Sequence, residues 1–280
     1  MGWGGKSDPV LAADGVGGSD AKAGGAMFLS CRPASFGPAA DEAFAHLAEW
    51  GVRFVEIALP KPEQAQRVQE DLQRHGLSVG SMQVAVDLGD AALPERMGEA
   101  ARRVREQFGA TRIFTSAHAG KLGLDAAYDA LRRVGDAVDP HGVTVVLETH
   151  PDLGTNGAVA AATMRAVNHP RIRINWDPAN VYFYNEHSDG RAEFDLAAPF
   201  LGGVHLKDTG GGFRSWDFPA LGDGIVDFRY MLQRLEKIGF DGPCTMEIEG
   251  IKGEQLSREQ YVARVRKSVD YVRGLGYFRS

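Results

Sequence analysis

From residue 26 onward, the sequence alternates between short apolar runs and longer amphipathic stretches, with a period of roughly 30 residues. Short apolar runs of this kind indicate buried strands, whereas apolar residues at helical spacing indicate helices packed on one face. The candidate strands are 26–31, 52–57, 77–82, 111–115, 143–148, 171–175, 202–206 and 243–248. The candidate helices are 39–50, 62–75, 92–108, 122–139, 155–168, 191–199, 226–238 and 256–273. This repeating order restricts the chain to a small set of α/β folds.

The segment 62–75 illustrates how each helix is inferred. Ala65, Val68 and Leu72 recur at helical spacing, with Glu, Gln and Arg residues between them. Gly76 follows, and glycine often ends a helix because it adopts the left-handed conformation without strain. We therefore expect a helix over 62–75 that stops at Gly76.

Eight strand–helix units in one direction favour a parallel sheet that closes on itself. Eight is the strand number at which a barrel is filled by its own side chains, and such barrels run to about 250 residues. An open doubly wound sheet is the alternative, and it usually carries a Gly-rich turn after its first strand. Here the residues after that strand are Arg32-Pro33-Ala34-Ser35, with no GxGxxG. The sequence therefore predicts a single (β/α)8 TIM barrel.

The domain organisation expected is a flexible leader over 1–25 followed by one barrel over 26–280. The leader is rich in Gly, Ala and Asp and lacks the basic-then-apolar order of a signal peptide. No apolar run approaches the roughly 20 residues that span a bilayer. Cys31 and Cys244 form no CxxC pattern and suit a reducing compartment. We therefore expect a cytoplasmic protein with no membrane partner.

Composition narrows the partners further. Hydrophobic residues make up 44% of the 280 residues and charged residues 24%, which is ordinary for a soluble globular protein. The formal net charge of −6 is spread along the chain. Nucleic-acid binding needs a clustered basic surface, so no nucleic-acid partner is expected.

Four consecutive candidate strands end in a carboxylate or an imidazole: Glu148, Asp177, His205 and Glu247. A lone Glu there is usually a helix cap or a rim salt bridge, and a lone His a satisfied core residue. Together they favour a metal site, because buried carboxylates are costly unless paired or bound to an ion. Glu249 shares a face with Glu247 but lies farther out, so Glu247 is preferred. Three carboxylates and one imidazole suit Mn²⁺ or Mg²⁺, with Co²⁺ and Zn²⁺ also possible.

Further polar and aromatic residues lie in the segments after these strands, where barrel enzymes build active sites. His150 is a candidate acid or base because the pKa of histidine lies near neutrality. Lys207 and His118 are candidate substrate contacts, although a salt bridge or rim packing would also explain them. Asn180 and Trp216 complete the expected substrate contacts, and Trp216 lies in the long segment 207–224.

The segments VVLETH, NWDPAN, GVHLKD and TMEIEG, with LGDGIVDF, resemble the xylose isomerase-like sugar-phosphate isomerase/epimerase superfamily. The resemblance covers roughly residues 26–275. It implies that the metal of that family is held here by the four strand-end residues Glu148, Asp177, His205 and Glu247. It is a poor guide to substrate, because one fold supports many reactions.

The resemblance implies chemistry on a sugar or cyclitol carbonyl. A metal-chelated substrate loses the proton next to its carbonyl and forms an enediolate. Return of the proton gives epimerisation or isomerisation, and loss of a β-oxygen gives elimination. In relatives that epimerise ketoses the two ligand glutamates transfer the protons, which implies this role for Glu148 and Glu247, with His150 as a further acid or base.

The sequence departs from the ketose 3-epimerase pattern at three positions. Asn180 stands where the family often has His, Gly154 where those epimerases have Glu, and Gly211 where they have Arg. These differences keep a lyase open beside the isomerase/epimerase, with a keto-sugar, an inosose or a 3-keto-glycoside as substrate.

Two remote alternatives remain. An apurinic-site endonuclease would need extra zinc-binding histidines, but Asn180 replaces one and no Asp-x-His follows His205. A non-catalytic barrel that kept its metal is the other. The expected partner is a small sugar or polyol, and a homo-oligomer is possible.

Overall fold

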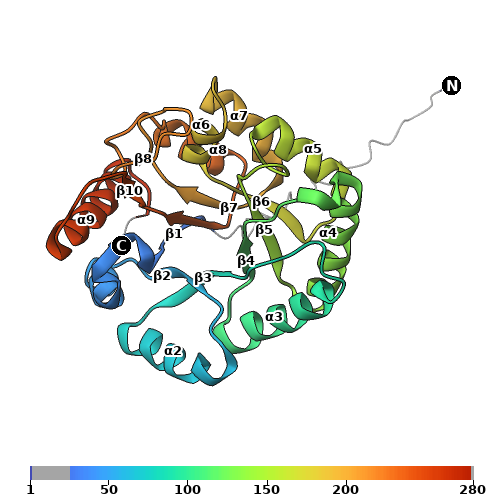
Figure 1. The fold of residues 1–280 in the computed structure, drawn as a ribbon, viewed down its shortest axis with the longest axis horizontal. Coiled ribbons are helices and arrows are strands. Elements are labelled where there is room, and N and C mark those ends of the chain that lie inside the picture. The colour runs from blue at the N-terminus through green and yellow to red at the C-terminus, as the bar shows by residue number, and fades with distance from the viewer. Residues whose placement is uncertain (2–25, 279–280) are drawn as a thin grey trace.

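The computed structural model describes Met1 and residues 26–278 and contains a closed, all-parallel barrel. Its strands follow chain order around the ring, and β9 closes the barrel against β1 (Figure 1). The barrel strands are β1 (Phe28–Cys31), β2 (Phe54–Ala58), β3 (Ser78–Gln83), β4 (Arg112–Thr115), β5 (Thr144–Glu148), β6 (Ile172–Trp176), β7 (Leu201–Leu206) and β9 (Pro243–Met246). The predicted TIM barrel is confirmed. The flexible leader predicted over 1–25 lies outside the described residues, apart from Met1.

Helices surround the strands (Figure 1). The α-helices are α1 (Ala43–Glu49), α2 (Pro62–His75), α3 (Leu93–Phe108), α4 (Leu124–Val138), α5 (Gly157–Val167), α6 (Pro178–Tyr184), α7 (Gly190–Ala197), α8 (Phe228–Lys237) and α9 (Arg258–Gly274). The 3₁₀ segments are η1 (Pro33–Glu42), η2 (Gly120–Leu122), η3 (Asp139–His141) and η4 (Ala198–Phe200). The first predicted helix, 39–50, is in fact a 3₁₀ segment followed by the short α1. Pro38 lies inside η1 and disfavours an α-helix there.

Helix α2 shows why the apolar period works as a predictor. It spans the predicted 62–75, and Ala65 and Leu72 are its buried residues. Gly76 caps it with φ +61°, in the left-handed region that glycine tolerates. Each helix buries such a face against the strands, and the strands are covered on both sides, as in β5, where every residue is buried.

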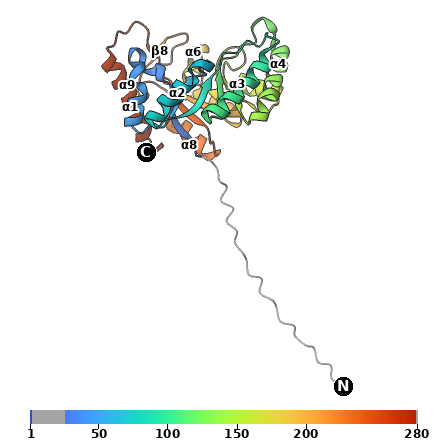
Figure 2. The same ribbon diagram turned by 90° about the horizontal axis from the view of Figure 1, so that it is seen from below.

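Three elements at the rim were not predicted. Helix α6 begins directly after Asp177, whose side chain caps it, with Pro178 in its first turn. The short strands β8 (Asp217–Phe218) and β10 (Gly250–Ile251) pair antiparallel and link the segments after β7 and β9. Figure 2 shows β8 near the upper end of the barrel when the molecule is seen from the side.

The long segment after β7 is organised around one buried carboxylate. Asp208 is 1% exposed, and its two oxygens accept backbone N–H groups from Thr209, Gly222, Gly224 and Val226 at 2.8–3.1 Å. These bonds fold the segment back onto the rim, where its aromatic residues lie beside the ends of the strands.

Other sequence expectations concern the environment of the chain. Within residues 26–278 the structure has no helix long and apolar enough to cross a membrane. Cys31 and Cys244 are buried free thiols, and burial raises the pKa of both. The cytoplasmic location stays a prediction.

Candidate metal centre

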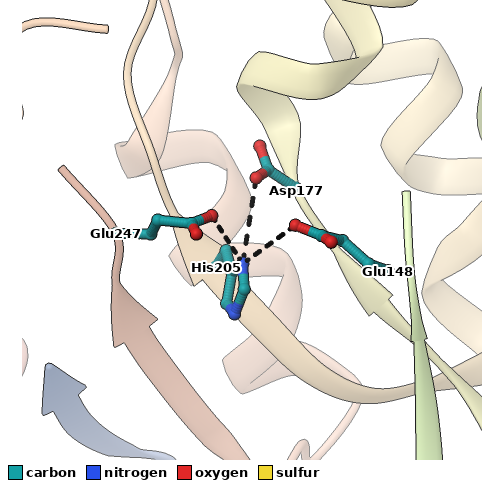
Figure 3. A group of neighbouring side chains, drawn as sticks. All are labelled: Glu148, Asp177, His205 and Glu247. Carbon is teal, nitrogen blue, oxygen red and sulfur yellow. Dashed lines mark ion pairs between the residues drawn. The ribbon is translucent and has the colours of Figure 1, made fainter. Parts of the chain in front are cut away.

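Four side chains from consecutive barrel strands meet at one end of the barrel: Glu148, Asp177, His205 and Glu247 (Figure 3). Glu148 ends β5, His205 lies in β7, and the other two directly follow β6 and β9. We call these residues the four-residue cluster. All are buried, and each offers one ligand atom within 4.8 Å of the others. Parallel strands deliver their ends to the same rim, which explains how residues 99 positions apart in the sequence come together.

The cluster is arranged around one nitrogen of His205. Its Nδ1 lies 3.0 Å from Glu247 Oε2, 3.7 Å from Glu148 Oε1 and 3.8 Å from Asp177 Oδ2. Glu148 and Glu247 approach this nitrogen from opposite sides (Figure 3). The carboxylates raise the pKa of His205 well above its ordinary value, although complete burial opposes this. The same field attracts a divalent cation, which would displace that proton.

The cluster fits a metal ion on structural grounds. Asp177 Oδ2, His205 Nδ1 and Glu247 Oε2 are buried and have no hydrogen-bond partner among the described residues. Buried unsatisfied polar atoms are costly, and a coordinated ion satisfies all three at once. Three carboxylates and one imidazole form a hard donor set of the kind that Mg²⁺ and Mn²⁺ accept. The cluster could therefore hold one divalent ion.

Glu56 fixes the orientation of His205 from the opposite side of the barrel. Its Oε1 lies 3.2 Å from His205 Nε2, and Ser81 Oγ donates to its Oε2 at 2.5 Å. Glu56 is 3% exposed and lies in β2. A carboxylate on the far nitrogen favours the tautomer that leaves Nδ1 free for an ion. Sequence reasoning missed Glu56, although an acidic residue inside the apolar run 52–57 was a readable signal.

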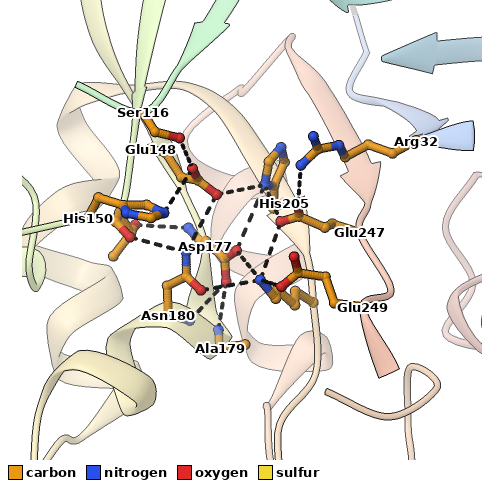
Figure 4. A network of polar contacts seen from close by, with 12 residues as sticks. Arg32, Ser116, Glu148, His150, Asp177, Ala179, Asn180, His205, Glu247 and Glu249 are labelled. Carbon is orange, nitrogen blue, oxygen red and sulfur yellow. Dashed lines mark hydrogen bonds and ion pairs between the residues drawn. The ribbon is translucent and has the colours of Figure 1, made fainter. Parts of the chain in front are cut away.

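Arg32 joins the first strand to the cluster (Figure 4). Its Nη1 donates to Glu247 Oε1, its Nε lies 3.5 Å from Glu56 Oε1, and its Nη2 donates to Gln83 Oε1 at 3.3 Å. The guanidinium thus neutralises part of the negative charge and leaves Glu247 Oε2 directed at His205. Sequence reasoning missed this role, yet Arg32 directly follows β1, a rim position.

Asp177 uses its two oxygens differently. Oδ1 accepts the N–H groups of Ala179 and Asn180 at 2.9 and 3.0 Å and so begins α6. Oδ2 is left for the cluster. Asn180, in the first turn of α6, donates to Thr149 O at 3.2 Å and lies 3.5 Å from Glu148 Oε1. A helix start therefore holds both residues in place.

A polar chain runs outward from Glu148. Ser116 Oγ donates to Glu148 Oε2, and His150 Nε2 lies 3.0 Å from the same oxygen. Tyr184 OH lies 3.1 Å from His150 Nδ1. Burial opposes ionisation of Glu148, but hydrogen bonds from His150 and His205 outweigh it and lower its pKa to about 2. Ser116 and Tyr184 were not among the predicted residues.

Lys207 lies beside the cluster rather than at the surface, and it is 3% exposed. Its Nζ lies 3.5 Å from Glu247 Oε2 and 3.7 Å from Asp177 Oδ2, and it pairs with Glu249. It also lies 4.4 Å from the centre of the Phe218 ring. Burial lowers the pKa of Lys207, but the surrounding carboxylates outweigh this and raise it. Glu249 is therefore engaged with Lys207, outside the four-residue cluster.

A cavity of about 180 Å³ opens over the cluster, and we call it the site cavity. Most of the residues predicted from the sequence line it: Glu148, Glu247, His150, Asn180, Lys207 and Trp216. His118 does not. It is exposed, its Nδ1 contacts Pro151 O, and its ring centre lies 5.5 Å from that of His150. The role expected for His118 as a substrate contact stays a prediction.

Comparison with known proteins decides the family. A sequence model described as "Xylose isomerase-like TIM barrel" matches residues 44–274. The chain belongs to the xylose isomerase-like TIM barrel family. The four-residue cluster lies within the matched region.

Among members with a stated activity, a ketose 3-epimerase from Arthrobacter globiformis is 32% identical over 130 residues. The match covers 45% of this chain and 42% of that protein, less than half the length of either. A solved D-allulose 3-epimerase from Methylomonas sp., in complex with D-allulose, has a TM-score of 0.69 at 19% identity, covering 89% of this chain and 97% of that chain. The probable 3-DHS dehydratase AsbF from Bacillus anthracis has a TM-score of 0.68 at 17% identity, covering 88% and 99%. These two structures share the fold.

Proposed function

We propose that this xylose isomerase-like barrel is a divalent-metal-dependent isomerase or epimerase of a sugar or cyclitol carbonyl. One observation carries the proposal: within the four-residue cluster, Glu148 and Glu247 lie on opposite sides of His205 Nδ1, and both line the site cavity. A substrate between them exposes its two faces to two carboxylates. The 32% identity to a ketose 3-epimerase supports the same reaction class.

A divalent ion in the four-residue cluster would supply Lewis-acid polarisation of the substrate carbonyl, which acidifies the neighbouring C–H. Mn²⁺ or Mg²⁺ suits this donor set best. The protein residues carry out the proton transfers. One glutamate removes the proton, and the other returns a proton to the opposite face or to the adjacent carbon. An enediolate connects the two steps.

The neighbouring side chains assist these transfers. His150 lies 3.0 Å from Glu148 Oε2 and can exchange a proton with it, while Tyr184 holds the other ring nitrogen. Lys207 lines the cavity and can donate to a substrate oxygen that gains negative charge. Phe114, Phe183 and Phe218 line the same cavity and reduce access of water.

A lyase is the second candidate, and the position of His150 favours it. This imidazole lines the cavity beside Glu148, where it could protonate a departing β-oxygen. A fold relative is described as a probable dehydratase. Gly154 and Gly211 stand where the family resemblance implies the Glu and Arg of ketose 3-epimerases, and this difference also supports a lyase.

Incubation with Mn²⁺ in D₂O tests both candidates with a panel of ketoses and inososes. Recovered sugar that carries deuterium, together with an epimer or isomer, supports the main proposal. An unsaturated product supports the lyase. A panel with neither exchange nor product rejects both. Glu247→Gln should abolish exchange, whereas the matched surface variant Glu99→Gln, whose partner is Arg102, should not.

The remaining expectations accompany this proposal. We propose a small polyol as the partner, no nucleic acid, a cytoplasmic location and a possible homo-oligomer. Size-exclusion chromatography with light scattering tests the last of these.

A further inference from the structure

A second cavity, of about 270 Å³, adjoins the site cavity. Arg32, Trp216, Glu247 and Glu249 line both cavities, so these residues form a shared wall. The far wall of the second cavity includes Tyr261. The mechanism proposed above makes no use of this space.

The boundary residue Trp216 is held in place by the rim strands. Its carbonyl accepts the N–H of Lys252 at 2.9 Å, next to the β8–β10 pairing. Its ring meets Phe218 and Phe183 nearly edge-on, with ring centres 5.1 and 6.1 Å away. Trp216 nevertheless stays 44% exposed. A large aromatic ring fixed by its backbone yet uncovered on the cavity side suits contact with a ligand.

The second cavity combines aromatic and charged groups. Trp216 and Tyr261 offer apolar ring faces, while Arg32 and Glu249 offer a donor and an acceptor, with side chains 19% and 32% exposed. A sugar ring has the matching chemistry, since its C–H groups pack on aromatic rings and its hydroxyl groups bond to charged side chains. Arg32 is paired with Glu247 and Glu249 with Lys207, yet Arg32 and Glu249 stay partly exposed. A purely apolar group would cover them without offering a hydrogen bond.

The volumes of the two cavities also favour a ligand that occupies both. The site cavity, at about 180 Å³, falls below the roughly 300–1,000 Å³ usual for ligand sites, and the second cavity brings the combined space into that range. We propose that the substrate carries a second sugar ring: the ketone-bearing ring occupies the site cavity, and the second ring occupies the second cavity against Trp216 and Tyr261. This inference rests on the proposed function and names its substrate class as a keto-glycoside.

Matched ketoses test the inference. D-Fructose is compared with glucosyl-fructoses that keep the ketone free and differ in linkage, namely turanose, maltulose, leucrose and isomaltulose. Deuterium incorporation in D₂O gives kcat/KM for each. At least one disaccharide should exceed D-fructose by tenfold or more. If D-fructose equals or exceeds all of them, the second-ring inference is wrong and the proposed function stands. If inososes exchange but no ketose does, the second-ring inference is wrong; if neither class exchanges, the proposed function itself fails.

A cavity-filling variant isolates the second cavity. Ala34 lines it and is exposed, so Ala34→Trp fills the space without disturbing the core. Ala34→Trp should lower the ratio of disaccharide to D-fructose kcat/KM by at least tenfold. The control Ala126→Trp, at an exposed position of α4, should leave the ratio unchanged. An unchanged ratio in Ala34→Trp, with circular dichroism of a folded protein, overturns the inference.

Discussion

The two halves of the barrel contribute charged side chains to the same site, but within residues 26–278 some buried atoms of one half lack hydrogen-bond partners, whereas the side chains of the other half are paired. In the half made of β5, β6, β7 and β9, Asp177, His205 and Glu247 each have one buried atom with no hydrogen-bond partner in the described part of the chain. Strands β1 to β4 bring Arg32 and Glu56, which are engaged with one another and with the cluster. The first half, which we call the binding half, therefore offers ligand atoms for a metal ion. The second half, which we call the holding half, keeps those ligands in position.

The largest effect should come from removing one charge of the binding half. In Asp177→Asn the retained oxygen can still cap α6, because Asn is as good a cap as Asp, but an anionic ligand is lost. Affinity for Mn²⁺, measured by calorimetry, should fall by more than about 100-fold, beyond the loss typical of outer partners. Deuterium exchange should fall with it.

Asp189 offers the matched control, since it caps α7 through the N–H groups of Arg191 and Ala192. Asp189→Asn should leave Mn²⁺ affinity unchanged. Equal losses in both variants would mean that Asp177 acts through the helix cap rather than as a ligand.

A smaller loss is expected in the holding half. Glu56→Gln removes the charge that faces His205 Nε2 and keeps the shape of the side chain. Mn²⁺ affinity should fall by roughly 10- to 100-fold, because outer partners orient the ligand without touching the ion. Calorimetry measures the Mn²⁺ affinity of Glu56→Gln and of the exposed control Glu99→Gln, which should keep the affinity of the unaltered protein. If Glu56→Gln loses as much Mn²⁺ affinity as Asp177→Asn, or none, the two halves do not have different roles.

The same division explains what the sequence could predict. The strands, α2 and the four cluster residues followed from apolar period and from the polar residue that ends each strand, both of which are local signals. Glu56 and His205 are 149 positions apart, and only closure of the barrel brings them into contact. Their pairing therefore had no local signature.

The rim shows a second limit of the sequence. Strands β8 and β10 are two residues each, too short for any periodicity to show. Helix α6 was missed because its seven residues directly follow a strand, although Asp177-Pro178 is a helix-start pattern. The role of Lys207 also depended on rim packing, which turns its ammonium group toward Glu247 and Glu249.

Asp208 is a buried polar residue of the rim segment that belongs to neither group of charged residues. Asp208→Asn puts an amide N–H group opposite backbone N–H donors of the rim segment, including those of Gly222 and Gly224. The free energy of unfolding, from urea denaturation, should fall by about 1–3 kcal/mol. The folded variant should bind Mn²⁺ as the unaltered protein does. Asp71→Asn, at the surface, should change stability by no more than about 0.5 kcal/mol. Weakened Mn²⁺ binding in Asp208→Asn would show that general disruption mimics the loss of a ligand.

The proposed reaction needs a metal ion in the four-residue cluster, and a titration measures whether one binds there. The full chain is treated with EDTA, dialysed, and titrated with Mn²⁺ in a calorimeter, with Asp177→Asn titrated in parallel. We predict one ion bound per chain with release of protons, as expected when His205 gives up its proton to the ion, and markedly weaker binding in the variant. Mg²⁺, Co²⁺ and Zn²⁺ are titrated in the same way, and binding of none of the four ions, or equal binding by the variant, would contradict the metal site.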